Sequence, residues 1–214
     1  MYLFKSKGVV MSQFFSINND NPQKRLILQA VEILNQGGVI VYPTDSGYAL
    51  GCKIGKNNAI EQMKKIRALT QHNFTLVCSS LSQLSQYAII DDNIYRYIKN
   101  VIPGAYTFIL KSTKLVPKVM MFKKKKEVGF RVPNNPIVLH LLEALDEPII
   151  STSLIFSDGH YFSDPYDIRQ ELERKVDLII DGGILEEEPS SIIEFLDGDM
   201  KILREGAGEL SLFR

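Results

Sequence analysis

The stretch from Gly37 to Gly51, GGVIVYPTDSGYALG, decides the fold class of this chain of 214 residues. Its residues 39–42 are apolar, mostly β-branched and followed by Pro43, a pattern that predicts a buried strand. The preceding residues, from Pro22 to Gln36, carry apolar side chains at helical spacing, which predicts a helix that Asn21 caps and the glycine pair ends. A helix that passes through glycine into a buried strand is typical of an α/β fold.

Helical and strand-like patterns continue to alternate along the chain. Further strands are expected at residues 74–78, 106–111, 128–132, 149–153, 177–180, 192–196 and 201–204. Further helices are expected at residues 58–69, 94–100, 136–145 and 166–174. Asp197-Gly198 predicts a tight turn between the last two strands, and such a hairpin is antiparallel. The predicted fold is therefore a single α/β domain with a mixed, parallel and antiparallel sheet flanked by helices.

The charge of the chain is balanced as a whole but not along its length. It carries 25 Lys and Arg against 25 Asp and Glu, which argues against a protein that coats nucleic acid or binds membranes through a basic surface. Residues 1–131 hold 19 basic and 7 acidic side chains, whereas residues 132–214 hold 6 basic and 18 acidic ones. If the fold keeps the two segments apart, we expect a basic face and an acidic face, and the basic face favours an anionic ligand.

Composition also bounds the class of protein. A hydrophobic content of 45% and a charged content of 23% are typical of a globular chain. Cys52 and Cys78 lie far apart and form no CxxC, which favours a reducing compartment. No apolar run reaches the roughly 20 residues that a membrane helix needs. We therefore expect a cytoplasmic protein that does not bind membranes.

Common catalytic motifs are absent, and polar residues gather instead where predicted strands and one helix end. The sequence has no GxxxxGK[ST], no HExxH and no GxSxG, and its three histidines lack metal-ligand spacing, so no metal site is expected. The polar residues at these ends are Thr44, Ser46, Lys65, Arg67, Thr107, Arg131, Ser151, Ser153 and Arg204. Taken singly, each is explained as well by an ordinary turn, a cation at a helix end or a surface residue. Together they favour a site that binds and positions anionic groups, and Gly47 and Gly51 would let a ligand approach the backbone there.

The order of seven motifs is more specific than any one of them. They are GGVIVYPTDSGYALG, KIR followed by HNFTL, PGAYTF, GFRVPNNP, ISTS, SDP and ILREG. In this order they resemble the YrdC/YciO family, and most closely its YciO branch, from about Asp20 to Gly206. We accordingly expect a domain at residues 20–206, an N-terminal arm at 1–19 with Met11 as an alternative start, and a tail at 207–214. The resemblance implies a twisted mixed sheet with a basic concave surface and affinity for nucleotides and for double-stranded RNA or tRNA.

YrdC-type relatives make threonylcarbamoyl-adenylate from L-threonine, bicarbonate and ATP. The resemblance therefore implies ATP with Mg²⁺ as a substrate complex, L-threonine or another small carboxylate as a partner, and no tightly bound cofactor. The family signature of KxR with SxN matches Lys65, Arg67 and Ser151, to which the resemblance assigns catalysis. It assigns substrate or nucleotide binding to Thr44, Thr107, Arg131, Ser153 and Arg204.

The chain departs from the family pattern at three places. Ser153 stands where the signature has asparagine, Ala105-Tyr106 where a second proline is usual, and Asn135-Pro136 where HP is usual. An asparagine amide donates and accepts hydrogen bonds at once, and a buried ligand group left unpaired costs about 1–3 kcal/mol. The phosphate side of the site is therefore retained, while synthase activity is one of three alternatives.

The second alternative is a non-catalytic RNA-binding module whose ligand pocket is a relic. Lys114, Lys118 and the run from Lys123 through Lys124 and Lys125 to Lys126 would then follow RNA phosphates. The same run is also typical of a solvated loop. The third alternative is a related enzyme that acts on another small carboxylate or adenylate. None of these patterns indicates an oligomeric state.

Overall fold

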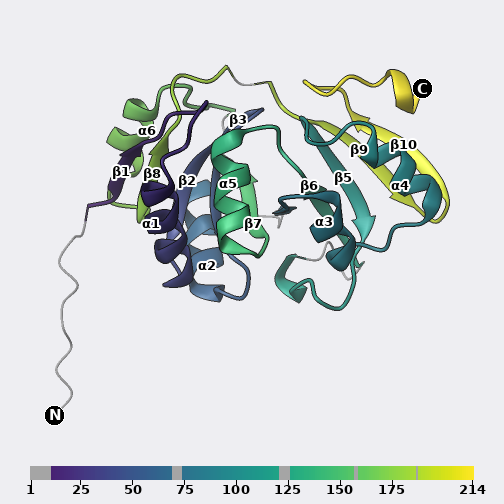
Figure 1. Cartoon of the computed structure of the whole chain (residues 1–214), viewed down its shortest axis with the longest axis horizontal. Helices are drawn as coiled ribbons and strands as arrows, with labels where there is room; N and C mark the ends of the chain where they lie inside the picture. Colours follow the sequence, from purple (N-terminus) through teal and green to yellow (C-terminus); the bar gives the residue numbers. More distant parts are fainter. Residues whose placement is uncertain (1–10, 69–73, 121–125, 157–158, 187) are drawn as a thin grey trace, which may run out of the picture.

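The computed structural model describes residues 11–68, 74–120, 126–156, 159–186 and 188–214, in which ten strands form one sheet (Figure 1). The strands are β1 (Gln13–Ser16), β2 (Val39–Thr44), β3 (Gly47–Lys53), β4 (Thr75–Val77), β5 (Tyr106–Lys111), β6 (Glu127–Arg131), β7 (Ile149–Ser153), β8 (Leu178–Asp181), β9 (Ser191–Leu196) and β10 (Asp199–Arg204). Their order across the sheet is β1-β8-β2-β3-β7-β4-β6-β5-β9-β10. Parallel pairs such as β4–β6 and antiparallel pairs such as β5–β6 both occur, so the predicted mixed sheet is confirmed.

The helices connect these strands, and side-chain caps set where four of them begin. They are α1 (Lys24–Asn35), α2 (Asn57–Arg67), α3 (Leu81–Tyr87), α4 (Asp92–Lys99), α5 (Pro136–Leu145) and α6 (Pro165–Leu172), with short 3-10 turns at Lys118–Met120 and Ser211–Phe213. Asp91, Asn135 and Asp164 each accept a hydrogen bond from a backbone N–H in the first turn of α4, α5 and α6. Ser80 does the same for α3. At α1 the cap position belongs to Gln23 and not to Asn21.

The segment after β2 is a strand and not a ligand-binding loop. It forms β3, which pairs antiparallel with β2 through a turn at Asp45 and Ser46. A Cβ at Gly51 would lie 2.7 Å from Cε1 of Tyr42 and 2.8 Å from Cγ2 of Ile149. The expected role of Gly51 in ligand approach is therefore wrong, because the missing side chain makes room for the Tyr42 ring.

Helices cover the two faces of the sheet unequally. On one face, α1 and α5 pack against β2, β3, β7 and β8 around buried residues such as Ile40 and Leu178. On the opposite face, α2, α3, α4 and α6 contribute to a second apolar cluster that runs along the sheet from Val41 to Phe195. Strands β5, β6, β9 and β10 contribute no described residue to the cluster under α1 and α5. On the face covered by α1 and α5, these two helices therefore do not extend over the four strands β5, β6, β9 and β10.

The fold does not keep the basic and acidic segments of the sequence apart. Strand β8, from the acidic segment, lies between β1 and β2, and β7 lies between β3 and β4. Ion pairs join the two segments at Lys53–Glu147, 2.7 Å, and at Lys111–Asp197, 2.5 Å. The difference in charge between residues 1–131 and residues 132–214 therefore does not predict a basic face opposite an acidic one.

Both ends of the described chain pack on the central part of the domain. Strand β1 pairs in parallel with β8, so residues 13–16 belong to the sheet. At the other end Phe213 is 3% exposed, and its ring centroid lies 5.9 to 6.5 Å from those of Tyr97, Tyr106, Phe108 and Phe195. The expected boundaries at residues 20 and 206 therefore leave out packed parts of the domain.

Phe213→Ala is expected to lower the free energy of unfolding by about 3 kcal/mol, because it leaves a cavity among four aromatic rings. Leu212→Ala is the matched control, since Leu212 is 51% exposed and its truncation should change the free energy by less than about 0.5 kcal/mol. Urea unfolding followed by circular dichroism measures both variants. Equal stability of the two would show that residues 207–214 are a separate tail after all.

Candidate functional site

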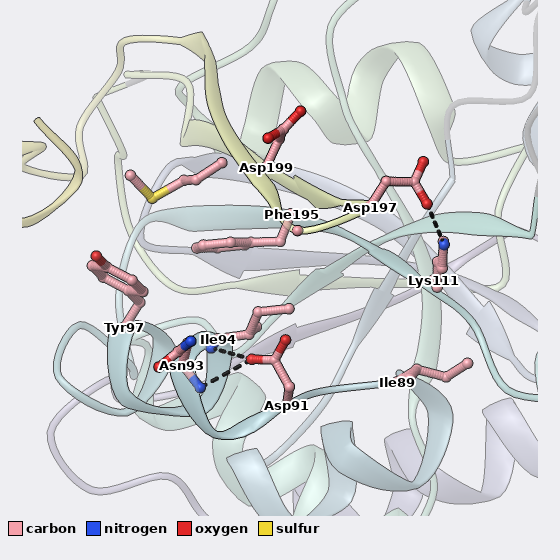
Figure 2. A pocket seen from close by; sticks show the side chains of 11 residues that line it. Ile89, Asp91, Asn93, Ile94, Tyr97, Lys111, Phe195, Asp197 and Asp199 are labelled. Atoms are coloured by element: carbon pink, nitrogen blue, oxygen red, sulfur yellow. Dashed lines mark hydrogen bonds and ion pairs between the residues drawn. The ribbon is translucent and has the colours of Figure 1, made fainter.

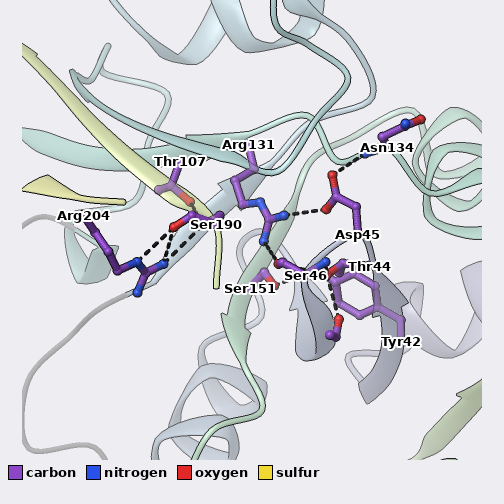
Figure 3. Close-up of polar contacts among 11 residues, drawn as sticks. Tyr42, Thr44, Asp45, Ser46, Thr107, Arg131, Asn134, Ser151, Ser190 and Arg204 are labelled. Carbon is purple, nitrogen blue, oxygen red and sulfur yellow. Dashed lines mark hydrogen bonds and ion pairs between the residues drawn. The ribbon is translucent and has the colours of Figure 1, made fainter. Parts of the chain in front are cut away.

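A cavity of about 390 Å³ opens where the face under α1 and α5 continues onto the uncovered strands. Its lining includes residues from β2, β3, α2, β4, β5, β6, β7 and β10, so the ends of elements far apart in the sequence meet there. The residues predicted from the sequence that line it are Thr44, Arg67, Thr107, Arg131, Ser151, Ser153 and Arg204. Figure 3 shows the polar contacts that most of them make.

Lys65 does not join these residues. Its side chain is exposed on α2, which ends at Arg67 with Ala68 in the left-handed conformation, φ 48°. Two residues apart on a helix means about 200° of rotation, so Lys65 and Arg67 point in different directions. The expectation that both cations turn toward one anion is therefore wrong for this conformation. Arg67 alone lines the cavity, where its Nη1 donates to the backbone oxygen of Ser153.

Arg131 enters the cavity from the end of β6 as a buried cation, 8% exposed. Its Nη2 donates to Oδ1 of Asp45 at 2.6 Å and its Nη1 donates to Oγ of Ser46 at 2.8 Å (Figure 3). Asp45 also accepts from the backbone N–H of Asn134 at 2.8 Å. A buried guanidinium is costly without such partners, so the β2–β3 turn holds it in place. Its Nε is buried and has no hydrogen-bond partner among the described residues, whereas Nη1 and Nη2 each keep a second N–H group for a ligand.

Arg204 forms another wall of the cavity at the end of β10. Its Nε and Nη2 donate to the backbone oxygen of Ser190 at 2.9 and 2.7 Å. The hydroxyl of Ser190 lies 2.8 Å from that of Thr107 (Figure 3). Burial, and then the positive charge of Arg131, lower the pKa of the Arg204 guanidinium. The two cations therefore repel each other, and an anion bound between them would relieve that repulsion.

Two other hydroxyls of the cavity donate their protons in hydrogen bonds to backbone oxygens. Oγ of Ser151 donates to the backbone oxygen of Leu50 at 3.2 Å and accepts from the Tyr42 phenol at 2.5 Å. Oγ1 of Thr44 donates to the backbone oxygen of Gly47 at 2.7 Å. Because a hydroxyl carries one proton, neither group has a proton left to donate to a ligand. Oγ1 of Thr44 also accepts from the backbone N–H of Ser46 at 3.1 Å and lies 3.3 Å from the Ser46 hydroxyl, so Ser151 is the one of the two that keeps a lone pair for a ligand. Burial raises the pKa of Tyr42 to about 12, so its phenol stays a donor at neutral pH.

The cavity thus has two kinds of binding group. Arg67, Arg131 and Arg204 present charged donors, which suit phosphate and carboxylate groups. Ser151 presents a lone pair, which suits an ammonium or hydroxyl group. Such an arrangement binds and orients an ionic substrate and favours catalysis by positioning and charge stabilisation.

Sequence reasoning missed three residues that shape this cavity. Tyr42 ends a buried strand and is typical of a core residue, and Asp45 is typical of a turn. Only the contact of Asp45 with Arg131, 86 positions along the chain, reveals its place in the site. Ser190 could have been predicted from the sequence, because it is a hydroxyl residue near the start of a predicted strand, as Thr107 is.

The lysines expected to bind RNA lie away from the cavity. Lys114 and Lys118 follow β5, Lys126 precedes β6, and all three are exposed. The cavity residues of β5 and β6 lie toward the opposite ends of these two strands. Lys123, Lys124 and Lys125 lie outside the described residues. The cavity and this basic segment are therefore separate features.

A larger cavity, of about 600 Å³, lies between α4 and the β9–β10 hairpin (Figure 2). Its ionisable groups include Asp91, which caps α4, and Lys111, which pairs with Asp197. Asp199 adds a third carboxylate. This surplus of negative charge does not suit an anion, so the candidate site is the smaller cavity.

Two further features are absent from the described ranges of the chain. No group of three His, Cys, Asp or Glu side chains there is placed to hold a metal ion. No helix there is long and apolar enough to cross a membrane.

Comparison with known proteins agrees with this fold. The model of a family named Sua5/YciO/YrdC, described as "Telomere recombination", matches residues 32–206. The chain is 54% identical over 205 residues to the YciO protein of Escherichia coli (strain K12). The aligned region covers 95% of this chain and 100% of that protein. The crystal structure of E. coli YciO matches with a TM-score of 0.91 over the same shares of the two chains.

Two more distant proteins carry functional names. A threonylcarbamoyl-AMP synthase of Saccharophagus degradans is 34% identical over 129 residues, which is 59% of this chain and 67% of that protein. The crystal structure of P. abyssi Sua5 complexed with L-threonine matches with a TM-score of 0.84 at 23% identity, covering 91% of this chain and 58% of that one. At that identity the match to Sua5 shows a shared fold.

Tyr42→Phe should lower the free energy of unfolding by about 1 kcal/mol at pH 7, because it removes a buried hydrogen bond to Ser151. It should also reduce the loss of stability in alkali. The folded pKa of about 12 lies above the ordinary value of 10.0, so the unfolded chain loses this proton first and stability falls as the pH rises from about 10 to 12. Urea unfolding at pH 7 and across that range measures both effects.

Tyr166→Phe is the control for this experiment, because Tyr166 is exposed on α6. Its alkaline loss of stability should equal that of the unaltered protein. If Tyr42→Phe shows the same alkaline loss as well, the buried Tyr42–Ser151 contact is contradicted.

Proposed function

The chain belongs to the Sua5/YciO/YrdC family, and on that basis we propose that it binds ATP and L-threonine and joins them with bicarbonate into threonylcarbamoyl-AMP. The observation that carries the proposal is the cavity with three arginines and the acceptor hydroxyl of Ser151. An amino acid offers an ammonium and a carboxylate, and ATP offers phosphates, so both substrates find groups of the required kind there.

Two relatives support the choice of substrates. The protein of S. degradans is named a threonylcarbamoyl-AMP synthase, and P. abyssi Sua5 was crystallised with L-threonine. The cavity of this chain has the matching polarity, since its arginines are donors and the Ser151 hydroxyl is an acceptor. At Ser153 the main-chain oxygen is engaged by Arg67, so this residue contributes to the cavity wall through its backbone.

The proposed reaction needs no side-chain nucleophile. The amine of L-threonine adds to the carbon of bicarbonate with loss of water, and an oxygen of the resulting carbamate attacks the α-phosphorus of ATP. The bond from that phosphorus to the bridging oxygen breaks, and pyrophosphate leaves with the electron pair. Arg131 and Arg204 would stabilise the negative charge on the phosphates, while Mg²⁺ arrives with ATP as part of the substrate.

The direct test is product formation by the purified protein with ATP, Mg²⁺, bicarbonate and L-threonine. Threonylcarbamoyl-AMP, identified by mass spectrometry, should appear in equal amount to pyrophosphate. Arg204→Gln should lower kcat/KM about tenfold or more, because it removes a charged donor from the cavity. Arg96→Gln on the exposed side of α4 is the matched control and should leave kcat/KM unchanged.

A lack of product from the unaltered protein, beside an active synthase of the same family, would remove the synthase proposal. Equal activity of the Arg204 and Arg96 variants would show that the reaction takes place elsewhere than in this cavity.

RNA binding is a second candidate function, which the exposed Lys114, Lys118 and Lys126 between β5 and β6 favour. Each phosphate that a lysine neutralises releases bound cations, so affinity should fall as salt rises. Replacing these three lysines by glutamine should weaken binding of a labelled RNA duplex and reduce the slope of log K against log salt by up to about 3. Fluorescence anisotropy over a salt series measures the slope.

Lys24→Gln with Arg25→Gln on α1 is the control, because these exposed cations lie on a different part of the sequence and fold. An affinity that does not vary with salt would contradict RNA binding through phosphate contacts. An unchanged slope in the triple variant would show that these lysines do not make them.

A further inference from the structure

Asp45 occupies an unusual position for a turn residue. Its carboxylate is 12% exposed and uses both oxygens, Oδ1 for Nη2 of Arg131 and Oδ2 for the backbone N–H of Asn134. It thereby links the β2–β3 turn to the connection between β6 and α5 (Figure 3). Neither contact closes the turn itself, so the Asp45 carboxylate joins its hairpin to another part of the chain.

The contacts of Asp45 and Ser46 decide which part of Arg131 is offered to a ligand. One N–H of Nη2 is taken by Asp45 and one N–H of Nη1 is taken by Ser46. The Nε of Arg131 is buried and has no hydrogen-bond partner among the described residues, although the side chain lines the cavity. Each Nη nitrogen carries a second N–H group beyond its contact with Asp45 or Ser46, and an anion in the cavity would accept from these groups.

We propose that Asp45 is a positioning residue that fixes the Arg131 guanidinium so that the remaining N–H groups of its Nη1 and Nη2 are presented to an anionic ligand. This inference rests on the proposed function only in that the cavity takes an anion. Asp45 need not touch the ligand, and it acts through Arg131. Its negative charge has a second, opposite consequence, because a carboxylate near the site repels an anion.

These two consequences make the variant Asp45→Asn informative. Asparagine keeps one oxygen but replaces the other by an amide N–H group, so it cannot accept from Arg131 and from Asn134 as the carboxylate does. The guanidinium then loses its fixed orientation, and we expect the Kd for inorganic pyrophosphate to rise about tenfold. Isothermal titration calorimetry with pyrophosphate measures this, and thermal unfolding checks that the variant is folded.

The matched control is Asp181→Asn. Asp181 is a comparably buried carboxylate, 9% exposed, that accepts a backbone N–H from Gly183 and does not line the cavity. Its substitution should leave the Kd for pyrophosphate unchanged. Ser46→Ala is a second test variant, since it removes the acceptor of Nη1 through a small change and should weaken binding in the same direction.

A double-variant cycle separates positioning from a merely structural role. In the Arg131→Gln background, Asp45→Asn should cause no further rise in Kd, because the group through which it acts is gone. A further rise of the same size would show that Asp45 matters only by holding the Asn134 backbone, and would overturn the proposal.

The other outcomes are equally decisive. Tighter binding of pyrophosphate by Asp45→Asn would show that the carboxylate only reduces the positive charge of the site, and an unchanged Kd would show that it plays no part; either overturns the proposal. Failure of the unaltered protein to bind pyrophosphate would overturn it too. Normal pyrophosphate binding with the expected loss in Asp45→Asn, but no adenylate product, would reject the proposed synthase function and leave this inference standing.

Discussion

The pocket depends on the buried guanidinium of Arg131. A cation that is 8% exposed requires an opposite charge and hydrogen-bond acceptors close by, and the β2–β3 turn provides both. In the sheet, β7 and β4 lie between β3 and β6, a separation of about 14 Å if the sheet were flat. The 2.6 Å contact between Arg131 and Asp45 therefore reaches across two intervening strands. It joins the β2–β3 turn to the end of β6, and Thr44 and Ser46 line the cavity together with Arg131.

The uneven layer of helices determines what fills the cavity. Under α1 and α5 the face is apolar and closed, with Tyr42 fully buried at its margin. Beyond it, strands β5, β6, β9 and β10 carry Thr107, Arg131 and Arg204 on the same face. A ligand can therefore contact the closed half through the Ser151 hydroxyl and the open half through cations. Thr107, Arg131 and Arg204 are held by strands rather than by flexible loops, which is the condition under which a site positions its ligand most precisely.

Much of this arrangement could be read from the sequence, for identifiable physical reasons. Short β-branched runs, side-chain caps such as Asn135 and the Asp197-Gly198 turn are local signals, and the elements that they predict are present. Hydroxyls and arginines at strand ends indicated the site because a sheet brings such ends together. Strand β3 was not predicted, because its glycines are typical of a loop until the Tyr42 ring is seen against Gly51. Lys65 was misplaced and Asp45 missed because side-chain direction and long-range ion pairs depend on the tertiary fold.

The strand order also has a consequence for how the protein folds. Strand β8 must insert between β1 and β2, and β9 pairs with β5 before β10 can form the edge that carries Arg204. Contacts between residues so distant in the sequence slow folding, since long loops have to close before those contacts form. During synthesis, some edges of the first strands therefore stay unpaired until the strands that pair with them have been made. Because Arg204 lies on the last strand, the wall of the cavity is complete only once nearly the whole chain has been made.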